Sequence, residues 1–213
     1  GGESGVGAAY LAKAKGFDVF LSDMGSIRDN YKTELDQLGI AYEEGKHTEE
    51  TILSADWIIK SPGIPKKAEI IQKINLKGIR LSSEIEFASE FTGAKIVAIT
   101  GSNGKTTTTS LIYHILKEYG FNVGLGGNIG KSFAKQVAEE AHDFYVLEVS
   151  SFQLDDIQNF RPYISLLLNL SKDHLDQYNY DYEEYALAKF RITENQDQDN
   201  FFIYNKDDEM SQK

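Results

Sequence analysis

The strongest constraint on the fold is an apolar run that leads into a glycine-bearing loop and then into a helical pattern. The apolar run is Ile96–Ile99, and the loop that follows it ends at Gly104. Lys105 and Thr106 open the helical stretch. Glycines let backbone N–H groups turn inward, the start of a helix adds a positive field, and a lysine adds a mobile cation. This order predicts a site for nucleotide phosphates, with Thr106 as a ligand of Mg²⁺.

The spacing of this loop is a variant of the general phosphate-loop pattern, because Ile99 occupies the position of the first glycine. The alternative is a glycine-containing turn in an ordinary strand–helix unit. The loop alone does not separate a kinase from a GTPase or a ligase.

Strand-like and helix-like segments alternate along the chain, which predicts an α/β fold with a mostly parallel sheet. Two domains are expected, residues 1–92 and residues 93–213, with the boundary near Phe91–Gly93. The glycine-rich run Gly1–Gly7 looks like a strand-to-helix turn whose strand is missing. The apolar run Phe201–Tyr204 reads as a strand entering a loop near the end of the chain. We therefore expect a fragment of a longer protein.

Composition excludes several classes of function. The 213 residues carry a net charge of −11 and show no basic stripe, so nucleic acid is not an expected partner. No apolar run approaches the roughly 20 residues of a membrane-spanning helix, and no export signal is visible. Cysteine is absent, so disulfides and thiolate metal sites are excluded. We expect a cytoplasmic protein that does not bind membranes and is monomeric.

Further polar residues follow predicted strands, where α/β proteins place their ligands. Asn128 lies in a glycine-rich turn, and Glu148 lies near the end of an apolar strand, where a carboxylate is costly unless it is paired or bound to a metal. His174 lies among carboxylates after another apolar strand. Lys189 lies on a predicted helix, where a lysine is usually a solvated cation. Spacing alone assigns it no role.

Taken together, the motifs resemble the Mur ligases, and most closely those that add D-glutamate. The resemblance rests on five strings in order: T-G-S-N-G-K-T-T-T-T from Thr100, G-G-N-I-G from Gly126, L-E-V-S-S-F-Q-L from Leu147, N-L-x-x-D-H-L-D-x-Y from Asn169 and A-K-F-R-I-x-E-N from Ala188. Ser61–Ile64 in the first domain fits as well. The resemblance covers essentially the whole chain.

This resemblance implies a Rossmann-like domain for a UDP-sugar, followed by the first part of a phosphate-loop NTPase-like central domain. The family reaction uses ATP to phosphorylate the alanine carboxylate of UDP-N-acetylmuramoyl-L-alanine. D-glutamate then attacks the acyl phosphate, in the synthesis of peptidoglycan precursors. Two Mg²⁺ ions are implied. The domain that brings the amino acid is not in this chain, so the fragment alone is expected to be inactive.

The resemblance also assigns roles to individual residues. Lys105, His174 and Lys189 are expected to be catalytic, with Lys189 carbamylated by CO₂. Metal ligands are expected at Thr106, Glu148, His174 and Lys189. ATP is expected to contact Gly101, Ser102, Asn103, Gly104, Lys105, Thr106 and Thr107. The residues expected to bind the UDP-sugar substrate are Ser4, Asp23, Gly63, Asn128, Ser150, Gln153 and His174.

One departure from the family pattern affects the UDP site. Met24 and Gly25 follow Asp23, where some relatives carry hydroxyl and basic residues. Asp23 after a glycine-rich turn also suits a dinucleotide ribose, although the turn reads G-x-x-G-x-G. The remaining alternatives are a sister Mur enzyme, a folate polyglutamate ligase, and a nucleotide-binding regulatory module that has lost catalysis.

Overall fold

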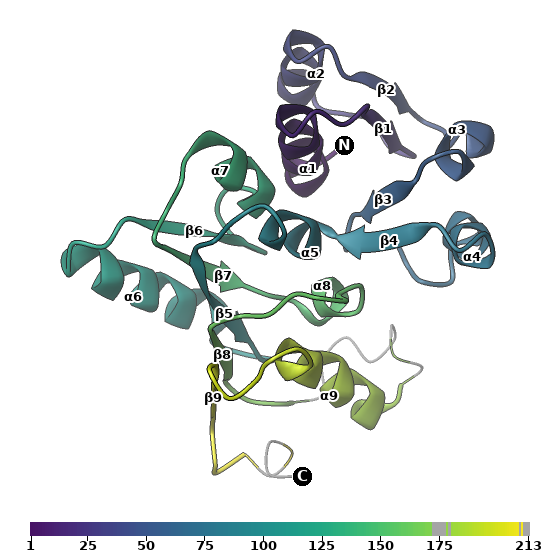
Figure 1. Cartoon of the computed structure of the whole chain (residues 1–213). Helices are drawn as coiled ribbons and strands as arrows, with labels where there is room; N and C mark the ends of the chain where they lie inside the picture. Colours follow the sequence, from purple (N-terminus) through teal and green to yellow (C-terminus); the bar gives the residue numbers. More distant parts are fainter. Residues whose placement is uncertain (172–177, 179, 209, 211–213) are drawn as a thin grey trace. The chain divides into compact units, whose positions relative to one another are not determined.

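The computed structural model describes residues 1–171, 178, 180–208 and 210 (Figure 1). The chain forms two compact units. The first contains Gly1–Phe91 together with Ser132–Glu140, and the second contains Thr92–Lys131 together with Ala141–Lys213. The predicted division assigned all residues after 92 to the second domain, whereas the structure groups the segment Ser132–Glu140 with the first unit.

The first unit is built from short parallel strands and the helices that connect them. Strands β1 and β2 form one parallel pair, and β3 and β4 form another. The elements of this unit are α1 (Glu3–Ala14), β1 (Phe20–Asp23), α2 (Asp29–Gln37), β2 (Ala41–Glu44), α3 (Glu49–Leu53), β3 (Trp57–Lys60), α4 (Glu69–Leu76), β4 (Arg80–Ser83), α5 (Glu84–Ser89) and α7 (Phe133–Glu139).

Helix α1 changes the interpretation of the glycine-rich run at the start of the chain. The helix begins at Glu3, so Gly5 and Gly7 lie inside it and not in a turn. A Cβ atom on Gly7 would lie 1.9 Å from Ser132 Oγ, so this glycine allows α1 to pack closely against the start of α7. Only Gly1 and Gly2 precede the helix.

A buried carboxylate ties α7 into the first unit. Glu84, which is 2% exposed, accepts hydrogen bonds from Ser132 Oγ and Ala134 N, both at 2.7 Å. Burial raises the pKa of this carboxyl group, against the opposing effect of those hydrogen bonds. At the surface, Lys135 pairs with Glu34 at 2.6 Å. These contacts explain why a helix that lies between β6 and β7 in the sequence belongs to the first unit.

The second unit is organised around one parallel sheet of five strands in the order β6-β7-β5-β8-β9. Its central strand β5 is apolar and buried on both faces, as expected of a strand inside a parallel sheet. The elements are β5 (Lys95–Thr100), α6 (Lys105–Glu118), β6 (Val123–Gly127), β7 (Phe144–Glu148), α8 (Ser151–Leu154), β8 (Ile164–Leu167), α9 (Tyr182–Phe190), η2 (Arg191–Thr193) and β9 (Phe201–Tyr204). The predicted α/β class is confirmed.

Candidate active site

The carboxyl ends of four neighbouring strands in the second unit carry most of the predicted site residues. The phosphate loop follows β5, Glu148 ends β7, Asn128 follows β6 and Asn169 lies two residues beyond the end of β8. All of these strands are parallel, so their carboxyl ends lie along one edge of the sheet, which is the usual location of ligand sites in such folds.

The phosphate loop depends on two glycines with positive φ. Gly101 has a φ of +146°, and Gly104 has a φ of +83° immediately before α6. Non-glycine residues adopt such values at a cost. In this conformation the Lys105 ammonium donates to the carbonyl oxygens of Gly101 at 2.9 Å and Ser102 at 3.0 Å. The lysine is therefore folded back on its own loop, and its contact with nucleotide phosphates stays a prediction.

Glu148 is the buried acid of this edge, with 2% of its surface exposed. The hydroxyl group of Thr106 donates to Glu148 Oε2 at 2.7 Å, and the side-chain amide of Asn128 donates to Oε1 at 2.9 Å. Asn128 also donates its backbone N–H to the Glu148 carbonyl at 2.8 Å. The structure thus brings together three predicted residues, one from the start of α6, one just after β6 and one at the end of β7.

The donor set around Glu148 suits a hard cation. A carboxylate and a threonine hydroxyl are the oxygen ligands that Mg²⁺ prefers, and Mg²⁺ completes its shell with water and substrate phosphates. Within the described ranges, no group of three or more His, Asp or Glu side chains forms a ready-made metal cage. Thr106 and Glu148 therefore fit a magnesium ion that binds together with a nucleotide.

Lys189 lies on α9 and is 3% exposed. Its ammonium lies 4.7 Å from the centre of the Tyr185 ring, one turn earlier on the same helix. The Tyr185 hydroxyl lies 2.9 Å from Ser102 Oγ in the phosphate loop. A buried lysine differs from the solvated cation that a helical lysine usually is. Its carbamylation stays a prediction.

Ser150 and Gln153 form a capping box at the start of α8. Ser150 Oγ accepts from the Gln153 backbone N–H at 3.3 Å, and Gln153 Oε1 accepts from the Ser150 N–H at 3.0 Å. Their observed role is to end β7 and begin α8 directly after Glu148. Contact of either residue with a substrate stays a prediction. His174, the predicted metal ligand and catalytic residue, lies outside the described residues.

Two residues that contact the phosphate loop were not predicted from the sequence as site residues. Asn169 was only the first letter of a longer motif and Tyr185 was not singled out, yet both hydrogen-bond to the phosphate loop. A polar residue just beyond an apolar strand next to the loop strand is the signal that identifies Asn169. Tyr185 has no comparable local signal, because a tyrosine on a helix usually packs in the core.

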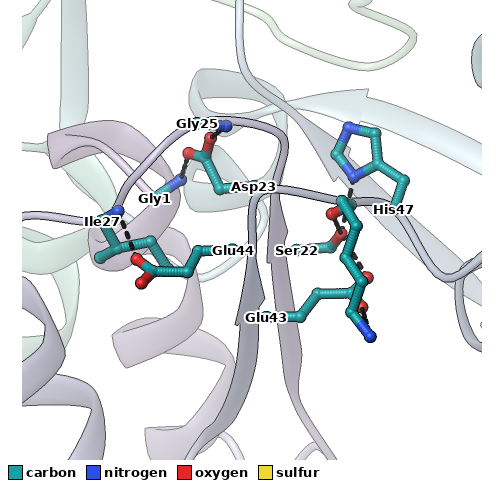
Figure 2. A network of polar contacts seen from close by, with 9 residues as sticks. Gly1, Ser22, Asp23, Gly25, Ile27, Glu43, Glu44 and His47 are labelled. Atoms are coloured by element: carbon teal, nitrogen blue, oxygen red, sulfur yellow. Dashed lines mark hydrogen bonds and ion pairs between the residues drawn. The ribbon is translucent and has the colours of Figure 1, made fainter.

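In the first unit, Asp23 ends β1 and accepts a hydrogen bond from the Gly25 N–H at 2.7 Å (Figure 2). Ser4 lies in the first turn of α1. Gly63 lies in an exposed turn, within which Ile64 N donates to Ser61 O at 3.1 Å. Within the described part of the chain, no hydrogen bond or ion pair joins these three residues to one another, so their shared role in binding UDP stays a prediction.

A second polar cluster lies beside Asp23 and was not predicted. Glu43 on β2 accepts from Ser22 Oγ at 2.7 Å (Figure 2). It also accepts from the Thr48 N–H at 2.7 Å and from the Thr48 hydroxyl. Ser22 Oγ also lies 2.7 Å from His47 Nδ1. Burial opposes ionisation of Glu43, but these hydrogen bonds outweigh it and lower the pKa to about 2.

Comparison with known proteins places the chain in a family. The model of the Mur ligase middle domain matches residues 99–213, which is more than half of the chain. This chain belongs to the Mur ligase family. A model of the MurD N-terminal domain also matches residues 7–70, so the predicted resemblance to the D-glutamate-adding Mur ligases is confirmed.

Two relatives of this Mur ligase chain carry the same name. A UDP-N-acetylmuramoylalanine–D-glutamate ligase of Bacteroides fragilis is 62% identical over 207 residues, which is 97% of this chain and 47% of that protein. The corresponding ligase of Christiangramia forsetii is 58% identical over 208 residues, 98% of this chain and 47% of the relative. The chain therefore spans about half the length of the curated relatives it matches.

Solved Mur ligase structures share the fold. The UDP-N-acetylmuramate:L-alanyl-gamma-D-glutamyl-meso-diaminopimelate ligase of Neisseria meningitides aligns with a TM-score of 0.68 at 22% identity, covering 100% of this chain and 71% of that one. The UDP-N-acetylmuramate-alanine ligase of Thermotoga maritima aligns with a TM-score of 0.58 at 21% identity, covering 99% and 49%. Among the described residues, no helix is long and apolar enough to span a membrane.

Proposed function

We propose that the full-length protein containing this chain is an ATP-dependent ligase that adds D-glutamate to UDP-N-acetylmuramoyl-L-alanine. The observation that carries the proposal is the direct link between the phosphate loop and a buried acid, the 2.7 Å hydrogen bond from Thr106 to Glu148. The name of a relative at 62% identity supports the choice of substrates. The reaction would supply a peptidoglycan precursor.

The reaction that the family resemblance implies would run in two steps at this edge of the sheet. An oxygen of the alanine carboxylate attacks the terminal phosphorus of ATP, and the bond from that phosphorus to the bridging oxygen breaks, so ADP leaves. The amine of D-glutamate then attacks the carbonyl carbon of the acyl phosphate, loses a proton and expels inorganic phosphate. Lys105 would leave its carbonyl partners to bind the transferred phosphoryl group, whose charge needs electrostatic stabilisation.

Magnesium and a modified lysine belong to this proposal. Thr106 and Glu148 would hold one Mg²⁺ ion, which offsets negative charge on the phosphates, and His174 would serve a second ion. Lys189 would react with CO₂, lose a proton and become a carbamate, because an ammonium would repel nearby cations whereas a carbamate offers anionic oxygens. The burial of Lys189 supports this assignment, since a lysine that only serves as a surface cation is exposed to solvent.

The substrate would be recognised by both units. Asn128, Ser150 and Gln153 would face the muramoyl-alanine end, and Ser4, Asp23 and Gly63 would bind the UDP part. All of these residues lie in one chain, so the proposal requires no oligomer. The nucleotide substrates are intracellular metabolites, and we therefore propose a cytoplasmic reaction.

The experiment measures phosphate release by the full-length protein with ATP and Mg²⁺. Release that requires both UDP-N-acetylmuramoyl-L-alanine and D-glutamate is the expected result. Lys105→Met should abolish it while leaving the thermal midpoint near that of the wild type. Release only with the substrate pair of a sister Mur ligase, or with a folate and glutamate, would replace the proposed substrates. Absence of nucleotide binding would favour a regulatory module.

A further inference from the structure

Asn169 makes three hydrogen bonds to two consecutive residues of the phosphate loop. Its side-chain Oδ1 accepts from the Asn103 backbone N–H at 2.9 Å, and its side-chain Nδ2 donates to the Asn103 carbonyl at 3.0 Å. Its own backbone carbonyl accepts from the Ser102 N–H at 2.9 Å. The side-chain amide thus pairs with the Asn103 backbone as a neighbouring strand would. This pairing also fixes the amide orientation, because the reversed orientation would place two donors together.

The next residues of the same segment fix the loop at Ser102. Ser102 Oγ accepts from the Ser171 N–H at 2.9 Å and donates to the Ser171 carbonyl at 3.1 Å. The Tyr185 hydroxyl lies 2.9 Å from the same oxygen. A hydroxyl group has one donor and two acceptor positions, so Tyr185 must donate. The whole hydrogen-bonding capacity of Ser102 Oγ is then used to fix the loop.

Close packing beneath the loop supports the same arrangement. A Cβ atom on Gly101 would lie 3.1 Å from Leu168 Cβ and 3.3 Å from the backbone N and O of Asn169. Such distances are tighter than ordinary side-chain contacts, so glycine allows the loop to approach this segment closely. The loop is therefore held by the chain that follows β8, and its shape does not depend on its own sequence alone.

We propose that Asn169 is a positioning residue that presets the phosphate loop for the nucleotide. In this conformation the N–H groups of Ser102 and Asn103 are bonded to Asn169. The first N–H groups of α6 have no acceptor within the helix, so they are the donors that the preset loop offers to a phosphate. The inference rests on the proposed function, because it concerns how the same loop binds ATP.

The position of these bonds separates a positioning role from a purely structural one. Asn103 is exposed and Asn169 is only partly buried, so removing the amide leaves groups that water can satisfy. The folded state should therefore lose little stability. The loop, in contrast, would have more conformations to lose when a nucleotide binds, and a binding site that is not preset binds more weakly.

The test uses the full-length protein with Asn169→Ala, Asn169→Asp and a control, Asn200→Ala. The control removes an amide that caps a local turn, with Asn200 Oδ1 accepting from the Asp197 N–H at 3.1 Å, away from the phosphate loop. The measurements are the Kd of a non-hydrolysable ATP analogue, the KM values for ATP and D-glutamate, kcat and the thermal midpoint.

For Asn169→Ala we expect the Kd of the analogue and the KM for ATP to rise roughly tenfold, with the KM for D-glutamate and the thermal midpoint little changed. Asn169→Asp should weaken binding further, and added salt should relieve part of that extra loss, because the new charge repels phosphate. Asn200→Ala should stay within about twofold of the wild type.

Two results would overturn the inference while the proposed function stands. One is wild-type affinity for the analogue in Asn169→Ala. The other is a joint fall of kcat and thermal midpoint with every KM unchanged, which is the signature of a structural role alone. A wild-type protein that binds no ATP analogue would overturn both the inference and the proposed function.

Discussion

At the scale of single residues, Gly127 shows how closely two strand ends approach each other. Its φ is +92°, and a Cβ atom there would lie 2.2 Å from the Glu148 carbonyl oxygen. The turn that carries Asn128 can reach Glu148 because this position has no side chain.

We therefore expect Gly127→Ala to lower the free energy of unfolding by more than about 1 kcal/mol and to weaken nucleotide binding. Gly120→Ala is the matched control, since Gly120 has a φ of +87° but nothing within 4 Å of its Cβ position. Both substitutions place alanine at a positive φ, but only the one at Gly127 also brings a Cβ atom against the Glu148 carbonyl. The difference between the two variants in free energy of unfolding, measured with denaturant on the full-length proteins, therefore reports the effect of this close contact. Equal losses in the two variants would contradict the close-approach argument.

Glu43 gives a prediction for the pH dependence of stability. Hydrogen bonds from Ser22 and Thr48 hold its pKa at about 2 in the folded protein, below the usual 4.5. The stabilisation that comes from a lowered pKa is fully present above pH 4.5 and is lost as pH falls towards 2.

Ser22→Ala removes one of these donors, so the pKa of Glu43 in the folded variant should lie closer to 4.5 than it does in the wild type. We expect the variant to be less stable than the wild type at pH 7, with the difference shrinking between pH 4.5 and pH 2 as the carboxylate is protonated in both. Denaturant unfolding across this range measures it. Ser54→Ala, which removes a local bond to the Thr51 carbonyl, should show no such convergence. A difference independent of pH would exclude the carboxylate as the cause.

At the scale of elements, the start of α9, the helix that carries Lys189, is capped by the residue that precedes it, Asp181. The Asp181 carboxylate accepts from the N–H groups of Glu183 at 2.8 Å and Glu184 at 3.3 Å, as an N-cap residue does.

Asp181→Ala should therefore lower stability by about 1 kcal/mol and speed hydrogen exchange in the first turn of α9. Asp181→Asn keeps an acceptor oxygen and should recover most of the loss. Exchange rates measured by mass spectrometry, with α6 as the internal reference, test this. Unchanged exchange in Asp181→Ala would mean that tertiary packing alone holds the helix start.

The elements that the sequence predicted well are those with a single strong pattern. The apolar run Ile96–Ile99 lies within β5, and the apolar run Phe201–Tyr204 is β9. The helical stretch expected to open with Lys105 is α6, which begins at that residue. Strands β2 and β4 were missed because their residues are largely polar, A-Y-E-E and R-L-S-S. The side chain of Glu43 on β2 is satisfied by hydroxyl groups that come from other segments, and no local pattern shows such partners.

Local sequence patterns also predicted part of the candidate site, but not its contacts between distant segments. Lys105, Thr106, Asn128 and Glu148 were expected after strands, and the structure brings them to one edge of the sheet. The link from Tyr185 to Ser102 spans 83 positions in the sequence, so only the folded chain reveals it. The capping role of Gln153 was hidden because the motif that contains it was interpreted as a substrate contact.

At the scale of the whole molecule, the chain passes between its two units more than once. It leaves the first unit after Phe91, returns for Ser132–Glu140 and leaves again at Ala141. Helix α7 places Phe133 and Ala134, both fully buried, in the core of the first unit. A contiguous chain of residues 92–213 therefore contains α7 but not the part of the first unit against which α7 packs.

Residues 92–213 expressed alone should accordingly leave α7 without its packing partners. We expect its amides to exchange in seconds, whereas those of β5 stay protected, and we expect the protein to aggregate more than residues 1–213. Hydrogen exchange and light scattering on the two chains measure this. Equal protection of α7 in both would mean that the helix is stable without Glu84 and α1.

The short stretch between Asn128 and Ser132 connects two residues whose side chains are both hydrogen-bonded to buried carboxylates. One end is fixed to Glu148 through the side chain of Asn128, and the other end is fixed to the buried Glu84 through Ser132. Four residues span at most about 14 Å when fully extended. The chain itself therefore limits the separation of Asn128 and Ser132 to about 14 Å, even if either of these hydrogen bonds is broken.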